Sequence, residues 1–257
     1  MNISIETHGC KLNMADSQIM VKQFSKMGYT LVSNDEQPDV YILNSCTVTA
    51  SADRKARRAL RSARNRYPNC LVVAAGCYPE RDAVIVGELT EVDLVIPNRL
   101  KSKIVDIVSE RLGKEYLPSP TEDKISGSSL LLGRTRASVK IQEGCDQICA
   151  YCIVPKVRGR ESSISADAIV GTINDLYETG CREVVLTGTQ LGTYGFDIGD
   201  INLSKLLKSI IELTDMPRIR VSSLQPLEIS DDLLDIWCSS RGRLCPHFHI
   251  PLQSGSD

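Results

Sequence analysis

The stretch VYILNSC, residues 40–46, joins an apolar, β-branched run to a cysteine. Short runs of this kind are typical of strands that are buried on both faces of a sheet. Comparable runs occupy residues 2–6, 71–75 and 93–96. Helix-like stretches alternate with them at residues 16–27, 51–66, 80–89 and 100–112. The alternation predicts an α/β domain over residues 1–112, with an open parallel sheet covered by helices on both faces. We expect Asp16 or Ser17 to cap its first helix.

Three cysteines come directly after predicted strands of this domain. They are Cys10, Cys46 and Cys77, in the contexts HGC, NSC and AGC. The carboxyl ends of parallel strands lie along one edge of an open sheet, and ligands bind at that edge. A single cysteine there would most simply be a small buried side chain, but three favour a metal site. We therefore expect the three thiols to converge, although they are far apart in the sequence.

A second domain is predicted after residues 113–136, which have no period, contain prolines and paired serines, and are interpreted as a linker. Further strands are expected at residues 137–142, 183–188, 218–223 and 247–252. Helices are expected between them at residues 165–179, 203–214 and 230–240, with none after the fourth strand. The spacing is typical of a β/α barrel. Four such units do not close a barrel, so residues 137–257 are expected to form a partial one that the chain leaves incomplete.

The composition excludes several classes of protein. The 257 residues carry 30 basic and 32 acidic side chains, which excludes a generally basic nucleic-acid-binding protein but allows a local basic patch. No apolar run is long enough to cross a membrane, and the first residues do not resemble a signal peptide, so we expect a cytoplasmic protein without membrane partners. In that compartment, ten cysteines indicate metal binding or catalysis and not disulfide bonds.

The stretch GCDQICAYC, residues 144–152, places three more cysteines after a predicted strand. Cys145, Cys149 and Cys152 follow the spacing C-x3-C-x2-C. A structural zinc site takes four ligands, and ferredoxin-type clusters take four thiolates. Three thiolates on a four-iron cluster would leave one iron open for a reactive ligand.

This spacing resembles that of the radical S-adenosylmethionine (SAM) enzymes. The longer stretch KIQEGCDQICAYCIVPKVRGRESS, together with Cys10, Cys46 and Cys77, resembles the methylthiotransferases within that superfamily. The segments EVVLTGTQLGTYG (183–195), RIRVSSLQP (218–226) and HFHIPLQSGSD (247–257) agree with it. They are most similar to the branch that acts on N6-threonylcarbamoyladenosine beside the tRNA anticodon.

The resemblance implies two four-iron, four-sulfur (4Fe–4S) clusters and SAM as cofactors. The catalytic cluster, on Cys145, Cys149 and Cys152, would bind SAM at its open iron and yield a 5′-deoxyadenosyl radical. The auxiliary cluster, on Cys10, Cys46 and Cys77, would carry the sulfur that is methylated and inserted. The implied partners are the anticodon stem-loop of tRNA, an electron donor such as a flavodoxin or ferredoxin, and an unidentified sulfur donor. The family normally continues with further barrel strands and a small RNA-gripping β-barrel, so the resemblance also implies a fragment.

Other residues near the predicted strand ends are candidates for cofactor contact. Tyr151, inside the cysteine loop, could pack on the adenine of SAM. Gln190, Ser223 and Gln253 follow the second, third and fourth strands of the partial barrel, at the edge where barrels bind ligands. Gln225 stands where the related branch usually has a glutamate. Lys156, Arg158 and Arg160 could hold a phosphate or carboxylate, or could be ordinary surface charge.

Residues 51–68, SADRKARRALRSARNRYP, carry a basic stripe opposite small apolar side chains at helical spacing. Such a stripe is either a solvated helix face or a phosphate-binding surface, and the acidic balance of the chain favours RNA contact. The candidates are Arg54, Lys55, Arg57, Arg58, Arg61 and Arg64.

Several alternatives stay open. The same chemistry could act on isopentenyladenosine in tRNA or on a ribosomal-protein aspartate. A non-catalytic carrier of electrons with two clusters would need a fourth protein ligand for each, and an RNA-binding zinc protein would need tetrahedral sites. The cysteines outside the two triplets are interpreted as structural, and they are Cys70, Cys181, Cys238 and Cys245.

Overall fold

The computed structural model describes residues 1–33, 35–113, 136–147, 149–252 and 254–255. The chain divides into two compact units. The first holds residues 1–128 and 148–158, and the second holds residues 129–147 and 159–257. Almost all of the expected linker, residues 113–136, lies outside the described residues. No helix in the part of the chain that the structure describes is long and apolar enough to span a membrane.

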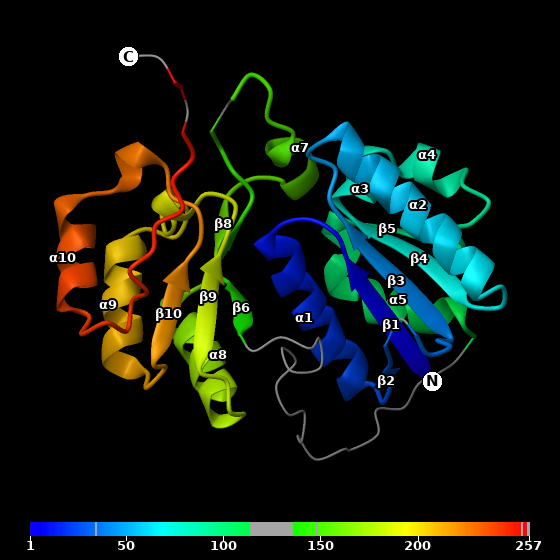
Figure 1. The fold of residues 1–257 in the computed structure, drawn as a ribbon, viewed down its shortest axis with the longest axis horizontal. Coiled ribbons are helices and arrows are strands. Elements are labelled where there is room, and N and C mark those ends of the chain that lie inside the picture. Colours follow the sequence, from blue (N-terminus) through cyan, green and yellow to red (C-terminus); the bar gives the residue numbers. More distant parts are fainter. Residues whose placement is uncertain (34, 114–135, 148, 253, 256–257) are drawn as a thin grey trace. The chain divides into compact units, whose positions relative to one another are not determined.

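The first unit is built on a five-stranded sheet in which every pair of neighbours is parallel (Figure 1). Its order is β2-β1-β3-β4-β5, for β1 (Asn2–Thr7), β2 (Thr30–Leu31), β3 (Val40–Ser45), β4 (Leu71–Gly76) and β5 (Leu94–Pro97). The open parallel sheet and its α/β class are confirmed, although the two-residue strand β2 was not predicted. The strand order reverses between β1 and β3, which is where open sheets of this kind bind their ligands.

Helices cover both faces of this sheet. They are α1 (Lys11–Lys26), α2 (Ala50–Arg66), α3 (Cys77–Arg81), α4 (Ala83–Gly87), the 3-10 helix η1 (Asn98–Lys103) and α5 (Ile104–Arg111). Helices α1 and α5 contact each other. Helices α2 and α4 share a separate apolar core with β3 and β4, which contains Leu43, Leu60, Val72 and Val86. The two groups therefore lie on opposite faces, as the parallel topology requires.

Two expectations about these helices were wrong. Helix α1 begins at Lys11, so Asp16 and Ser17 are buried inside it and do not cap it. The N-cap is Cys10, whose extended backbone starts the helix without a side-chain cap bond. The single helix expected at residues 80–89 is two short ones, because the backbone leaves the helical region at Asp82.

The second unit contains a parallel sheet of order β10-β9-β6, formed by β6 (Ala137–Lys140), β9 (Glu183–Thr187) and β10 (Arg218–Val221). Its helices are α8 (Ala166–Glu178), α9 (Leu203–Leu213) and α10 (Asp231–Ser239), and they share one apolar core with the strands. Two short strands, β7 (Gln142–Glu143) and β8 (Ser162–Ser163), pair in antiparallel fashion. Two 3-10 turns, η2 (Leu191–Thr193) and η3 (Pro226–Glu228), follow strands β9 and β10.

The fourth strand expected at residues 247–252 does not form. Only two isolated parallel bridges join this part of the chain to β10 and the residues after it, and they are Ile219 with Leu244 and Ser223 with His249. Pro246 lies between the two bridges and has no N–H to donate, so a continuous ladder cannot pass it.

Candidate metal centre

The first cysteine triplet lies at the carboxyl edge of the five-stranded sheet. Cys10 follows β1 and caps α1, Cys46 follows β3, and Cys77 is the first residue of α3 after β4. Burial raises the pKa of the Cys46 thiol, and the neighbouring Cys77 and Cys10 raise it further. Cys46 therefore lies within electrostatic range of both Cys77 and Cys10, at the sheet edge where the strand ends predicted the three thiols.

Two glycines let the cysteine loops approach each other. Gly9 has a φ of 130°, and a Cβ built on it would lie 2.6 Å from the Cβ of Cys46. Gly76 has a φ of 107°, and its Cβ would lie 2.7 Å from the backbone nitrogen of Ser45. These are left-handed conformations at close backbone contacts, so residues with side chains would be excluded on both grounds.

Each sulfur of this triplet has a polar partner. Cys10 Sγ donates to Asn13 Oδ1 at 3.6 Å. The Cys46 sulfur accepts a bond from the Val48 N–H at 3.5 Å, and the Cys77 sulfur accepts one from Asn98 Nδ2 at 3.3 Å. N–H donors directed at sulfur stabilise thiolates and tune iron–sulfur clusters.

The donor set fits an iron–sulfur cluster. Three soft thiolates are the ligands that such clusters prefer. Within the described residues, no three Cys, His, Asp or Glu side chains surround a single point as one metal ion requires. In a cluster each thiolate binds a different iron, so the sulfurs stay farther apart than around a single zinc ion.

The second triplet lies in a loop whose two ends are adjacent in space. Strands β7 and β8 pair at its base, and the Cys145 N–H donates to Gly159 O at 3.2 Å. Gly144 has a φ of 75°, and a Cβ there would collide with the backbone of Arg160. Cys145 is counted with the second unit, whereas Cys149 and Cys152 are counted with the first.

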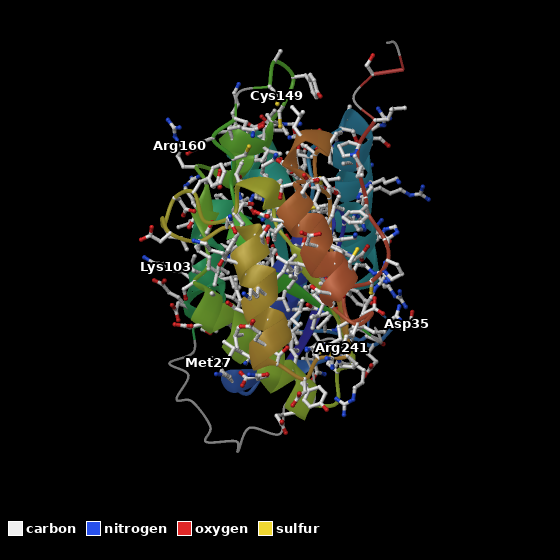
Figure 2. The ribbon with its side chains drawn as sticks, turned by 90° about the vertical axis from the view of Figure 1, so that its left-hand side faces the viewer. Met27, Asp35, Lys103, Cys149, Arg160 and Arg241 are labelled. Atoms are coloured by element: carbon white, nitrogen blue, oxygen red, sulfur yellow. The ribbon has the colours of Figure 1, made fainter. Side chains whose placement is uncertain are left out.

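The middle of the loop continues into α7 (Val154–Arg158), a helix that was not predicted. The Cys152 N–H donates to Cys149 O at 3.1 Å, which forms a tight turn just before it. Figure 2 shows Cys149 in this turn, and both Cys149 and Tyr151 are exposed. An exposed ring is available for a ligand, so the adenine contact of Tyr151 stays a prediction.

Arg158, at the end of α7, does not belong to the surface. Only 3% of its side chain is exposed, and its Nη1 lies 2.7 Å from Asp16 Oδ2. Reading it as ordinary surface charge was wrong, because the carboxylate that pairs with it comes from α1. Arg160, two residues later, is 89% exposed and pairs with Asp146.

The predicted cofactor residues of the second unit follow β9 and β10, and protein groups contact them. Gln190 donates through its side chain to Glu228, and Gly192 leaves the room that this carboxylate occupies. Ser223 Oγ lies 2.8 Å from His249 Nδ1. Gln253 lies outside the described residues.

Sequence reasoning missed Gln142, a fully buried residue that organises the loop at Gln190. Its Oε1 accepts bonds from the backbone N–H groups of Thr189 and Gln190, each at 2.9 Å. Its Nε2 donates to Gly144 O at 3.3 Å, beside Cys145. A glutamine at the end of an apolar strand was the only signal, and nothing in the pattern set it apart.

The basic stripe on α2 divides into two sets. Arg57 donates to the Tyr78 hydroxyl, Arg61 pairs with Glu91, and Arg64 pairs with Asp93. By contrast, Arg54, Lys55 and Arg58 are exposed and have no partner among the residues that the structure describes. The unpaired set lies in the first half of α2, which begins four residues after Cys46.

Comparisons with known proteins find similar sequences and folds. Residues 2–97 match the model of "Uncharacterized protein family UPF0004", and residues 139–257 match that of the "Radical SAM superfamily". All of the chain aligns with a "Threonylcarbamoyladenosine tRNA methylthiotransferase MtaB" from Aquifex aeolicus (strain VF5), at 37% identity over 264 residues and 64% of that protein. Along its whole length, the chain is therefore similar to the radical SAM methylthiotransferases. Enzymes of this family use SAM and 4Fe–4S clusters.

The chain is also similar to a "tRNA-2-methylthio-N(6)-dimethylallyladenosine synthase" from Endomicrobium trichonymphae, at 33% identity over all of the chain and 60% of that protein. It therefore spans about six tenths of the length of these curated relatives. The fold resembles that of the radical SAM methyltransferase TsrM from Kitasatospora setae, with a TM-score of 0.62, 12% identity, and coverage of 93% of this chain and 57% of the other.

Proposed function

We propose that this chain takes part in methylthiolation of tRNA, in which a methylthio group is added to C2 of N6-threonylcarbamoyladenosine beside the anticodon. One observation carries the proposal. The triplet Cys10, Cys46 and Cys77 follows three neighbouring strands at one edge of the sheet, in a chain that also carries C-x3-C-x2-C. Two three-thiolate sites, each with one iron left open, suit a reaction that needs both a radical and a sulfur donor.

The residues assign the two cofactor sites. Cys145, Cys149 and Cys152 would hold the cluster that binds SAM, and Cys10, Cys46 and Cys77 would hold the auxiliary cluster. When bound, these cofactors supply homolytic cleavage of SAM and transferable sulfur, which no acid–base side chain could replace at an aromatic C–H bond. The protein's own residues shape and shield the sites.

Several of those residues have definable tasks. The Val48 N–H and the Asn98 amide donate to cysteine sulfurs and favour their thiolate form. Gln142 fixes the loop at Gln190 and, through Gly144, the start of the second cysteine loop. Gln190 and Ser223 are proposed to contact SAM from the carboxyl edge of the second sheet.

The choice of tRNA as substrate has two supports. The relatives named above act on tRNA, and the Aquifex protein is named for threonylcarbamoyladenosine. The unpaired cations Arg54, Lys55 and Arg58 lie toward the cysteine end of α2, where phosphates could dock near the auxiliary site. A flavodoxin or ferredoxin as electron donor, and a cytoplasmic location, complete the proposal.

Anaerobic reconstitution of the full chain tests the cofactor assignment. We expect about eight irons per chain, and about four after either cysteine triplet is replaced by alanine. Cys70→Ala is the matched control, because Cys70 precedes β4 at the opposite edge of the sheet. Iron loss on joint replacement of Cys181, Cys238 and Cys245 would instead favour a two-cluster electron carrier.

The substrate is tested with the reconstituted protein, SAM, a reductant and two tRNAs that differ only in the threonylcarbamoyl group. Mass analysis of the nucleosides should find the methylthio product on the modified tRNA alone. A product found only on isopentenyladenosine, or only on a ribosomal protein, would contradict this substrate and leave the family unchanged.

A further inference from the structure

Two asparagines of the first unit each join one auxiliary cysteine to α7. Asn13 Oδ1 accepts from Cys10 Sγ at 3.6 Å and also from Arg158 Nη2. Asn98 Nδ2 donates to Cys77 Sγ at 3.3 Å and also to Val157 O at 2.5 Å. Each amide therefore binds the auxiliary site and the helix that follows Cys149 and Cys152.

The side chains that meet at Asn13 are buried, whereas Asn98 and its two hydrogen bonds are partly buried. Asn13 and Val157 are buried, and Arg158 and Asp16 each leave less than a twentieth of the side chain exposed. Asp16 Oδ2 accepts from Arg158 Nη1 at 2.7 Å and from Lys101 Nζ at 2.8 Å. Removing one partner of such a buried pair is costly, so α7 is held firmly.

The packing around α7 agrees with the hydrogen bonds. Helix α7 contacts α3, which begins at Cys77, and η1, which begins at Asn98. Asn98 Oδ1 is buried and has no hydrogen-bond partner among the described residues. The bonds that the Asn98 side chain makes to Cys77 and Val157 both come from its Nδ2 donor. Leucine would have nearly the same volume without either bond.

We propose that Asn98 is a positioning residue that locks α7, and with it the chain carrying Cys149 and Cys152, onto the site formed by Cys10, Cys46 and Cys77. Asn13 adds its bond to Cys10 only in the metal-free thiol form, because a cysteine that ligates iron has no proton to donate. The auxiliary site and the SAM-binding loop are then assembled together. An iron–sulfur group on the first triplet orders the loop that completes the second. This inference rests on the proposed function only for the identity of the group that the thiols hold.

The test uses the full chain with Cys145, Cys149 and Cys152 replaced by alanine, so that iron enters only the auxiliary site. In this parent, iron–sulfur loading should slow hydrogen exchange at the amides of residues 156–158. Asn98→Leu should speed that exchange by about tenfold, the effect of losing one well-formed buried hydrogen bond. It should also lower the midpoint potential of the cluster, because an N–H donor to sulfur favours the reduced, more negative state.

Arg158→Gln should speed exchange in the same segment, and Arg160→Gln is its matched control because Arg160 points into solvent (Figure 2). Asn98→Asp and Arg158→Lys replace these variants if they fold poorly. Asn98→Asp keeps the side-chain size but loses the N–H donors, and Arg158→Lys keeps the charge but loses the two-nitrogen contact with Asp16 and Asn13. Unchanged exchange and potential in iron-loaded Asn98 variants would overturn the inference. A parent that binds no iron–sulfur would overturn the proposed function, while exchange in the metal-free variants would still decide whether α7 is locked.

Discussion

Gly9 lies against Cys46, and a Cβ built on Gly9 would come within 2.6 Å of the Cys46 Cβ. Gly9→Ala should therefore separate the loops after β1 and β3. We expect a loss of stability of roughly 1–3 kcal/mol from the left-handed backbone alone, and loss of iron from the auxiliary site. Urea unfolding and iron analysis check both effects. Gly113→Ala is the control, because its φ is also positive but its Cβ would meet open space. Equal iron content in the two variants would contradict the role given to Gly9.

Cys70 should make stability depend on alkaline pH. Burial raises the pKa of its thiol from 9.0 to about 11, so the folded protein keeps a proton that the unfolded chain releases first. This contribution is complete below pH 9 and is lost as the pH rises toward 11. Urea unfolding of the metal-free protein should lose stability with pH more steeply in the wild type than in Cys70→Ala. Parallel pH profiles would show that the thiol titrates normally.

The two sets of cations on α2 should respond differently to substitution. Replacing Arg54, Lys55 and Arg58 by glutamine should weaken tRNA binding and lower the slope of log affinity against log salt by about 2 to 3. Replacing Arg61, Arg64 and Arg66 removes the same charge from side chains already paired with acids, so stability should suffer more than affinity. Fluorescence anisotropy across a salt series measures both slopes. Equal slopes of log affinity against log salt in the two triple variants would contradict separate roles for the unpaired and the paired cations.

Gln142→Leu should destabilise the second unit. The change leaves the backbone N–H groups of Thr189 and Gln190 without their acceptor, at a cost of roughly 1–3 kcal/mol for each. Gln142→Glu keeps the acceptor but loses the donation to Gly144 and buries a second carboxylate beside Glu161, so it should recover only part of the stability. Chemical unfolding of the three proteins gives the comparison. A leucine variant as stable as the wild type would mean that water replaces the amide.

The sequence predicts well whatever depends on local pattern. Apolar runs located β3 and β4 to within a residue or two, and the parallel arrangement then placed Cys46 and Cys77 at one edge. The start of α1 was missed because its N-cap residue is Cys10. This residue makes no side-chain cap bond, and cysteine is not a residue type that indicates a helix start in the sequence. The strand expected at residues 247–252 does not form, because Pro246 has no N–H to donate to a continuous ladder.

Contacts between distant residues could not be predicted. Arg158 stands in the polar stretch KVRGR, which looks like surface, and only the fold brings it to Asp16, 142 positions earlier. Gln142 poses the same difficulty, because a single glutamine carries no spacing signal. Such residues become visible only when their buried partners are known.

The loop that carries the second triplet has a consequence for chain connectivity. The polypeptide passes from one unit to the other three times, at 128–129, 147–148 and 158–159. A protease site engineered between residues 114 and 135 would therefore not free the two halves, because the downstream fragment still supplies α7 to the upstream one. The gene could accordingly be split there and expressed as two polypeptides that reassemble, whereas further cuts at both 147–148 and 158–159 should let the two units part.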